Sequence, residues 1–338
     1  MGTVFASYPL GQRMKPNQDF WILQYFVPCE PGLMLRCLRR IMPAGAEIIF
    51  DLEDAAQDPF SVANTLHVKK QARQNLAAFI EEHHSLLHGL PLGIRLNKLS
   101  SEHLENDLDF LHTVKDKISW GYVVLPKIES PEAFDSYCRL LDAAGVRYRE
   151  IIPIIETETG ALHLPSILHH LPKSLVRKVH FGHYDFCLDM GIFPILEQSD
   201  PDFWRIAVPV IRTIEEAGFH YCHTPCNRAR DPHAVHALLR TLIGICDRKF
   251  GMPSLSFEQT YACTSYDGTA RAITPKPALR LTDDEKQALA YRIMDLFHAH
   301  STHSRAFALG PDSRFYAPHD YLAAKAFLGK RTLIHEMA

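Results

Sequence analysis

The sequence predicts an α/β fold of the (β/α)8, or TIM barrel, type with a C-terminal helical extension. Short β-branched apolar runs alternate with longer amphipathic stretches from about residue 20, eight such runs occur, and the alternation ends near residue 265. This alternation is typical of a parallel sheet with helical crossovers, and eight repeats close naturally into a barrel. The expected parts are an N-terminal arm at 1–19, the barrel at 20–265 and the extension at 266–338.

The predicted strands are short runs rich in Val, Ile, Leu and aromatic residues. They span residues 20–28, 47–53, 91–97, 121–128, 150–157, 178–186, 219–227 and 252–258. Helices are expected where a polar cap precedes Pro, as at Ser130 and Asp231, and after Ser100 or Ser101. Residues 282–300 and the stretch after Pro318 predict the helices of the extension.

Composition and charge exclude several classes of function. The chain has 338 residues, 46% of them hydrophobic, which is enough for a sizeable core. Its formal net charge is −3 and it has no dense Lys/Arg run, so we expect no nucleic acid and no membrane as a partner. The eight cysteines are scattered and no signal peptide is recognisable, which favours reduced thiols in a cytoplasmic protein. We expect a homo-oligomer, the common state of such barrels, with a small-molecule carboxylate as its substrate.

Polar residues close five of the predicted strands. They are Asp51, Glu53 and Asp54; Arg95 and Asn97; Lys127 and Glu129; Glu156 and Glu158; and His183 and Asp185. A lone charged residue at such a place is more often a helix cap or a salt bridge at the rim, which is what we expect of Glu129 and Glu158. In a barrel the C-terminal ends of the strands hold the chemistry, and buried charges are costly unless they are paired or bind a ligand. The recurrence at one rim therefore predicts a cation and an anionic substrate.

The chemistry of these side chains indicates which of them bind the cation and which bind the substrate. Glu156 and Asp185 end neighbouring predicted strands, and carboxylates without an adjacent Cys/His set favour Mg2+, which also binds water and substrate oxygens. Arg95 is expected to hold a substrate carboxylate or carbonyl through a bidentate contact, with Asn97 and Lys127 as further substrate-binding residues.

These segments resemble the citrate lyase beta-subunit-like family, which includes malyl-CoA lyases and aldolases of the phosphoenolpyruvate/pyruvate barrel superfamily. The resemblance runs over roughly residues 24–330. Its segments are YFVPCEPGLMLRCL, GAEIIFDLEDAAQDP, GIRLN, VVLPKIESPEAF, PIIETETGAL, HFGHYDFCLDMG and AFALGPDSRFYAPHDYLAAKAFL. It implies that Glu156 and Asp185 ligate Mg2+, which would stabilise the enolate left when a carbon–carbon bond breaks. It also implies that Arg95 binds the substrate, and we count Asp51 and Glu53 with it as catalytic residues that orient metal waters or basic partners.

Two segments depart from the family pattern. LSFEQ, with Ser256 and Phe257, stands where the family has Ile-His-Pro-x-Gln, and FYA at 315–317 stands where it has Met-Ile-Asp. Both fall near the place where acyl-CoA relatives close the site. The resemblance alone therefore does not imply that the substrate is a CoA thioester.

The segment HYCHTPCNRAR at 220–230 and the histidine of the sixth strand leave further roles open. A zinc site is one reading of the segment, but Cys222 and Cys226 would share one strand face while His223 points to the other. A rim loop that recognises phosphate or carboxylate fits better, and Arg228 is its expected substrate contact. Strand alternation would put His183 on the same side as Asp185, as an acid/base or supporting group.

The sequence leaves three hypotheses for the function of the protein. The first is a Mg2+-dependent carbon–carbon lyase or aldolase that acts on a hydroxy or oxo acid, with or without CoA, through a metal-stabilised enolate. The second is a biosynthetic barrel enzyme of the same superfamily with a phosphorylated or sugar-derived substrate, which the Arg228 and Arg230 loop suggests. The third is a non-catalytic binding or assembly subunit, which the two departures suggest.

Overall fold

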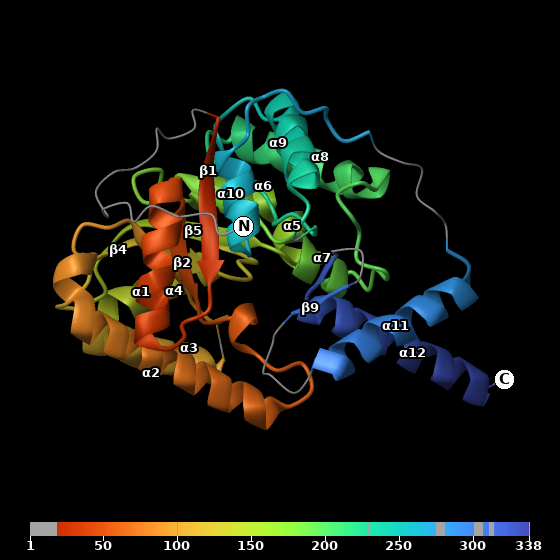
Figure 1. The fold of residues 1–338 in the computed structure, drawn as a ribbon, viewed down its shortest axis with the longest axis horizontal. Helices are drawn as coiled ribbons and strands as arrows, with labels where there is room; N and C mark the ends of the chain where they lie inside the picture. The colour runs from red at the N-terminus through yellow and green to blue at the C-terminus, as the bar shows by residue number, and fades with distance from the viewer. Residues whose placement is uncertain are drawn as a thin grey trace, which may run out of the picture.

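The computed structural model describes residues 19–99, 101–228, 230–274, 281–300, 307–310 and 314–337. Eight parallel strands form a closed barrel in the order in which they occur in the chain (Figure 1). They are β1 (Phe20–Phe26), β2 (Glu47–Asp51), β3 (Leu92–Arg95), β4 (Trp120–Leu125), β5 (Tyr148–Ile155), β6 (Lys178–Phe181), β7 (His220–Cys222) and β8 (Phe250–Ser254). The predicted (β/α)8 barrel is therefore confirmed. Apart from Asp19, the predicted N-terminal arm lies outside the described residues.

Helices follow the strands and cover the outside of the barrel. They are α1 (Pro31–Ile41), α2 (Val62–Leu87), α3 (Glu102–Val114), α4 (Pro131–Ala143), α5 (Glu158–Leu162), α6 (Leu164–His170), α7 (His183–Asp189), α8 (Pro201–Glu216), α9 (Pro232–Ile245) and α10 (Phe257–Thr264). The side chains of Ser101, Ser130 and Asp231 accept backbone N–H hydrogen bonds at the starts of α3, α4 and α9. These caps are the ones expected from the sequence, because a polar side chain satisfies N–H groups that the first helical turn leaves unpaired.

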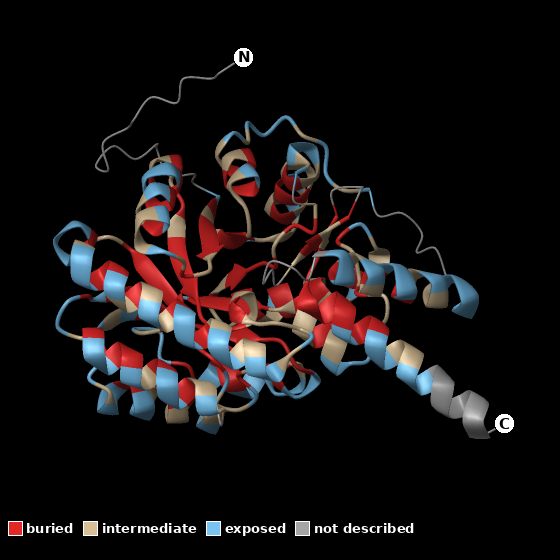
Figure 2. Ribbon diagram, turned by 60° about the horizontal axis from the view of Figure 1, so that its bottom comes forward, coloured by how far each residue is buried: buried red, intermediate tan, exposed pale blue. Residues whose placement is uncertain are grey.

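The hydrophobic core has two layers. The larger layer lies between the strands and the helices, and Figure 2 shows it as a buried region under helices whose outer faces are exposed. The smaller layer fills the barrel interior and consists of Leu23, Tyr25, Ile49, Tyr122, Val124, Ile152, Ile154 and Cys222. Gly251 faces this layer, where an added Cβ would stand 2.5 Å from Cys222 Sγ. The barrel interior is thus a packed core, and ligands must bind at its rim.

The C-terminal part adds two helices and a short hairpin. α11 (Asp283–His300) and α12 (Pro318–Met337) pack against each other beside the barrel, and β9 (Ala308–Leu309) pairs with β10 (Phe315–Tyr316) (Figure 1). The first turns of α12 also pack on α7, where Ala323 contacts a small cluster with Cys187 and Ile195. The extension therefore brings the start of α12 to the C-terminal rim of the barrel.

The sixth and seventh strands differ most from the predicted ranges, and the shorter sixth strand changes the place of Asp185. The sixth strand ends at Phe181, and residues His183–Asp189 form α7. The seventh strand is only His220–Cys222. The expectation that His183 and Asp185 alternate on one strand is therefore wrong, because in a helix residues two apart point in different directions.

No helix among the described residues is long and apolar enough to cross a membrane.

Candidate active site

A small cavity of about 70 Å³ lies at the C-terminal rim of the barrel, where most of its residues follow the strands. It is lined by Tyr25, Asp54, Arg95, Ile154, Glu156, His180, Gly182, Tyr184, Asp185, Thr224, Pro225, Leu255, Phe307, Ala317 and His319. We call this cavity the chamber. Three of the predicted site residues, Arg95, Glu156 and Asp185, are brought together in it.

Arg95, the last residue of β3, is held by carboxylates from the end of β2. Its Nε and Nη2 donate to the two oxygens of Asp51 at 2.7 and 2.5 Å, and its Nη1 donates to Asp54 at 2.9 Å. Nη1 also lies 3.1 Å from Glu53 Oε2. Burial opposes ionisation of Asp51, but the guanidinium lowers the pKa of this carboxyl. Asp51 and Glu53 therefore fix the orientation of Arg95, whose side chain is 11% exposed and lines the chamber.

Glu156 follows β5 and enters the chamber beside Gly182. Its Oε1 accepts a hydrogen bond of 2.9 Å from the backbone N–H of Lys127, a residue whose φ of 50° is in the left-handed region. A Cβ on Gly182 would overlap the Glu156 carboxylate, so glycine is needed for this close approach. Burial and the neighbouring Asp185 raise the pKa of Glu156 to about 7. Glu156 is thus a buried carboxyl whose negative charge the surrounding side chains do not fully neutralise.

Asp185, in the first turn of α7, lies between two basic groups. Its Oδ1 accepts a hydrogen bond from Lys127 Nζ, and its Oδ2 lies 2.8 Å from His319 Nε2. Burial opposes ionisation, but His319 and Lys127 lower the pKa of Asp185 well below its usual value. Burial also disfavours a charged His319, yet Asp185 and Asp54 raise the pKa of this imidazole to about 9. The aspartate, the lysine and the histidine therefore form a charged triplet at neutral pH.

The chamber has the side chains that a divalent cation requires. One ligand atom each from Asp54, Asp185 and His319 lies within 4.8 Å of the others. Around these atoms stand five acidic groups, from Asp51, Glu53, Asp54, Glu156 and Asp185, and four basic groups, from Lys69, Arg95, Lys127 and His319. Burial and Asp54 also raise the pKa of Glu53 well above its usual value. The acidic groups outnumber the basic ones by one, and the pKa values of Glu53 and Glu156 are raised, which fits a hard ion with oxygen ligands, such as Mg2+.

Two predicted substrate contacts lie away from the chamber. The side-chain oxygen of Asn97 accepts from Lys69 Nζ at 2.6 Å, and its amide donates to Asp107 at 2.8 Å. Asn97 is therefore a structural residue behind β2 and β3 in this structure. Arg228 Nη2 donates to Glu197 at 3.2 Å and does not line the chamber. Both side chains are held by protein partners at positions where they do not reach the proposed ligand.

The remaining histidine and cysteine predictions have a structural explanation. His183 Nδ1 lies 2.6 Å from Thr224 Oγ1, and burial lowers the pKa of its imidazole to about 3. It faces away from Asp185 and is a buried neutral ring. Among the described residues, the one group that could hold a metal ion is at Asp54, Asp185 and His319, so the segment 220–230 contains no zinc-type cluster. The eight cysteines are all free thiols.

Several chamber residues were not predicted from the sequence. The most important is His319, which lies 134 residues from its partner Asp185 and reaches it only because α12 packs on α7. The histidine follows Pro318, so a helix start could be expected there, but nothing local in the sequence indicates which strand ends it meets. Tyr25 and His180, whose hydroxyl and Nδ1 atoms are 3.3 Å apart, form the opposite wall and come from interior positions of β1 and β6.

The comparisons with known proteins agree with this architecture. The sequence pattern of the HpcH/HpaI aldolase/citrate lyase family matches residues 26–234, which is more than half of the chain and includes Arg95, Glu156 and Asp185. No curated protein matched the chain. RipC from Yersinia pestis has a similar fold, with a TM-score of 0.52, 20% identity and coverage of 77% of this chain and 97% of RipC.

Two further solved structures are similar. The citrate lyase beta subunit of M. tuberculosis, complexed with oxaloacetate and magnesium, has a TM-score of 0.52 at 16% identity and covers 74% of this chain and 98% of its own. Protein CitE of Mycobacterium tuberculosis in complex with magnesium, acetoacetate and coenzyme A has a TM-score of 0.51 at 17% identity, with coverage of 92% and 97%. At these identities the likeness shows the shared fold. The family pattern goes further: this chain belongs to the HpcH/HpaI aldolase/citrate lyase family and is an enzyme of the carbon–carbon lyase class.

Proposed function

We propose that the enzyme is a Mg2+-dependent lyase or aldolase that breaks or forms a carbon–carbon bond in a hydroxy or oxo acid. The observation that supports this most is the excess of carboxylates around the chamber, with Glu156 and Asp185 side by side. Proteins of similar fold were solved with magnesium and oxaloacetate, acetoacetate or pyruvate. A divalent cation, when bound, supplies positive charge that stabilises the oxyanion of an enolate.

Glu156 and Asp185 are the residues we expect to hold the cation. Glu156 is buried and Asp185 is only 12% exposed, and Lys127 fixes both: its backbone N–H donates to Glu156 and its ammonium donates to Asp185. Asp54, whose carboxylate lies in the same ligand group, is a third candidate. Contacts of this kind orient metal ligands and stabilise their charged form.

Arg95 is the residue we expect to bind the substrate carboxylate or oxo group. Its guanidinium lines the chamber while Asp51 holds it through two parallel hydrogen bonds. A guanidinium has five N–H donors, so the pairing with Asp51 and Asp54 leaves donor capacity for an anionic ligand. Asp51 and Glu53 then act by positioning Arg95, which refines their expected catalytic role.

The chamber residues also determine where protons are held. His319 and Lys127 carry protons next to Asp185, whereas burial and Arg95 keep His180 neutral by lowering its pKa to about 3. The chamber is small, and Leu255, Phe307 and Ala317 give it an apolar lining, which limits the number of water molecules beside a reactive enolate.

Conservative substitutions of the two proposed ligands test the function. Glu156→Gln and Asp185→Asn keep the shape of the side chains and remove their charge. We expect each to weaken Mg2+ binding in calorimetric titrations and to lower turnover of oxaloacetate or a related acid by about 100-fold or more, which is about 2.7 kcal/mol. Glu158→Gln is the matched control, because Glu158 is exposed in the first turn of α5.

The outcomes separate clearly. Loss of Mg2+ affinity in the first two variants and not in Glu158→Gln supports the proposal. Mg2+ binding and turnover that remain unchanged in both Glu156→Gln and Asp185→Asn would show that these carboxylates are not the metal ligands.

A further inference from the structure

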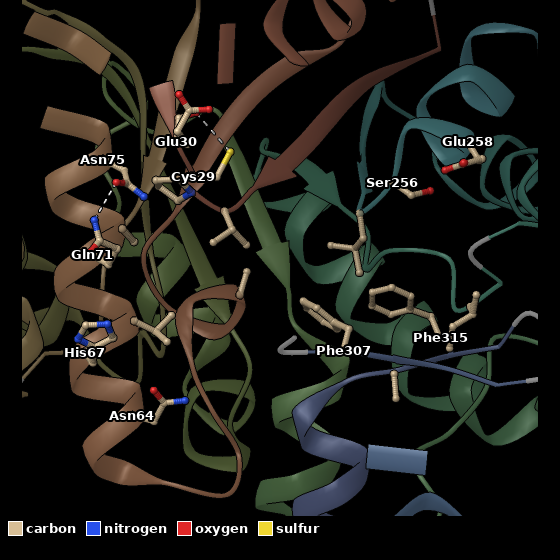
Figure 3. Close-up of a pocket in the computed structure, with 18 of the residues that line it drawn as sticks. Cys29, Glu30, Asn64, His67, Gln71, Asn75, Ser256, Glu258, Phe307 and Phe315 are labelled. Atoms are coloured by element: carbon tan, nitrogen blue, oxygen red, sulfur yellow. Dashed lines mark hydrogen bonds between the residues drawn. The ribbon is translucent and has the colours of Figure 1, made fainter. Parts of the chain in front are cut away.

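A second, much larger hollow adjoins the chamber. It is an open groove of about 910 Å³ between the β1–α1 loop, one face of α2, the β8–α10 loop and the β9–β10 hairpin (Figure 3). Leu255 and Phe307 line both the groove and the chamber. A substrate whose acid end lies in the chamber therefore has its remaining atoms directed into this groove.

One wall of the groove is a row of polar side chains on α2. Asn64, His67, Gln71 and Asn75 are spaced by three and four residues, so they share one helix face, and Figure 3 shows them along one side of the groove. The row extends for about 16 Å at 1.5 Å per residue. Gln71 Nε2 donates to Asn75 Oδ1 at 2.9 Å, which fixes the two amides relative to each other. This pairing leaves the Gln71 oxygen and the Asn75 nitrogen for a ligand.

The facing wall is aromatic. The rings of Phe307 and Phe315 have their centroids 4.5 Å apart at an interplanar angle of 38°, and both side chains lie across the groove from α2 (Figure 3). Amides both donate and accept hydrogen bonds, as hydroxyl groups do, and an aromatic face packs against the C–H groups of a hydroxylated carbon ring or chain. The paired amides of Gln71 and Asn75 opposite two phenyl rings thus match a ligand that presents hydroxyls on one side and C–H groups on the other.

The same groove is poorly suited to phosphate groups. Arg230 is the only Lys or Arg among its described lining residues. The N-terminus of α1, where a phosphate could bind, already has the Glu30 carboxylate as its cap, which accepts from the N–H groups of Gly32 and Leu33 at 3.3 Å each. At α10, Ser256 is the cap and Glu258 adds a negative charge to the first turn. Phosphates would meet carboxylates where helix dipoles would otherwise attract them.

We propose that this groove binds the tail of the substrate, and that the tail is a polyhydroxylated, phosphate-free chain or ring of the sugar-acid type and not coenzyme A. This inference rests on the proposed function, because it assumes that the acid end of the substrate occupies the chamber. Of the phosphorylated and sugar-derived substrates that the sequence left open, it selects the sugar-derived kind without phosphate.

Two acids that differ only in their tails test the inference. Glycolate and D-gluconate share a 2-hydroxy carboxylate, and only gluconate has a polyhydroxylated tail. In calorimetric titrations with Mg2+ we expect gluconate to bind at least 10-fold more tightly than glycolate. Gln71→Leu, Asn75→Leu and Phe315→Ala should each reduce this ratio and leave glycolate binding unchanged, because these three side chains line the groove and not the chamber. Gln74→Leu is the matched control, because Gln74 is on the same helix but does not line the groove.

The outcomes distinguish this inference from the proposed function. A gluconate preference that is lost in the groove variants, retained in Gln74→Leu and unaffected by coenzyme A supports it. Equal affinity for the two acids, a preference that the groove variants leave intact, or displacement of gluconate by coenzyme A would overturn it. If the binding of both acids needs Mg2+ and Glu156 but shows no preference, only the inference fails. If the binding needs neither Mg2+ nor Glu156, the proposed function fails as well.

Discussion

Gly182, between β6 and α7, gives a direct test of how the chamber is built. Gly182→Ala adds one methyl group to a residue with φ −93° and ψ 85°, and the negative φ is accessible to alanine. The effect of the substitution therefore comes from contacts. The new Cβ would lie 2.7 Å from Glu156 Cβ and 3.2 Å from Ile154 Cγ2, and it would overlap the Glu156 carboxylate. Glu156 or the start of α7 must move to accommodate it.

The magnitude follows from the tightness of these contacts. An extra methyl group in a well-packed region costs about 1–3 kcal/mol, and here the nearest atoms belong to the buried side chain of Glu156. Displacement of Glu156 also lengthens its 2.9 Å hydrogen bond from the Lys127 N–H. Since supporting contacts of metal ligands are worth about 10–100-fold in affinity, we expect Mg2+ binding to weaken by about that factor.

The assays are urea unfolding and calorimetric titration with Mg2+. Gly244→Ala is the control, because Gly244 is exposed near the end of α9 and no atom lies within 4 Å of an added Cβ. Alanine there should stabilise the protein by about 0.5–1 kcal/mol, since glycine is unfavourable inside a helix. If Gly182→Ala were as stable as the wild type and bound Mg2+ equally well, the close contact between Gly182 and Glu156 could not be what fixes this ligand.

Two further predictions concern stability. Lys178 Nζ lies 3.0 Å from both oxygens of Glu150 inside the barrel. Glu150→Gln leaves this buried ammonium without its counter-charge and should lower the free energy of unfolding, measured in urea, by about 3–5 kcal/mol. The double variant Glu150→Gln/Lys178→Met should recover most of that loss. Burial lowers the pKa values of His180 and His183 to about 3 and that of His223 well below 6.5, so the folded state binds fewer protons than the unfolded state below pH 6.5. Their contribution to stability is present above pH 6.5 and is lost as the pH falls. His223→Phe should lower the slope of the unfolding free energy against pH by about 1.4 kcal/mol per pH unit between pH 4 and 6. An unchanged slope in urea unfolding over this range would contradict the neutral, buried state of His223.

The barrel could be predicted because its signals are local. Each strand is a contiguous apolar run, and the side chains that close β3 and β5 are adjacent in sequence to the residues that form the strand. Arg95 and Glu156 were therefore placed at the right rim from the sequence. Asp51 and Glu53 were expected near them for the same reason, because β2 pairs with β3 in register, with Asp51 opposite Arg95.

The parts that could not be predicted depend on contacts between distant segments. In the run KVHFGHYDF only Gly182 stands at the point where β6 gives way to α7. A glycine inside a strand pattern can also mark a bulge, and the other residues fit either periodicity, so Asp185 was assigned to a strand. His319 reaches Asp185 through the packing of α12 on α7, which is a tertiary arrangement. Asn97 was assigned to the substrate because it ends a strand, but it turns instead toward Lys69 and Asp107.

The two departures from the family pattern acquire a common location in the structure. Ser256, in LSFEQ, lines the groove and caps α10, while Phe315, the first residue of FYA, forms part of the aromatic wall. Ala317, the last residue of FYA, lines the chamber. The side chains predicted to handle the acid end, Arg95 and Glu156, follow the family pattern. Two of the altered residues thus lie on the groove proposed for the substrate tail and one lies in the chamber, which fits the same bond-breaking step on a different substrate. A non-catalytic subunit would need neither Arg95 nor Glu156 in the chamber.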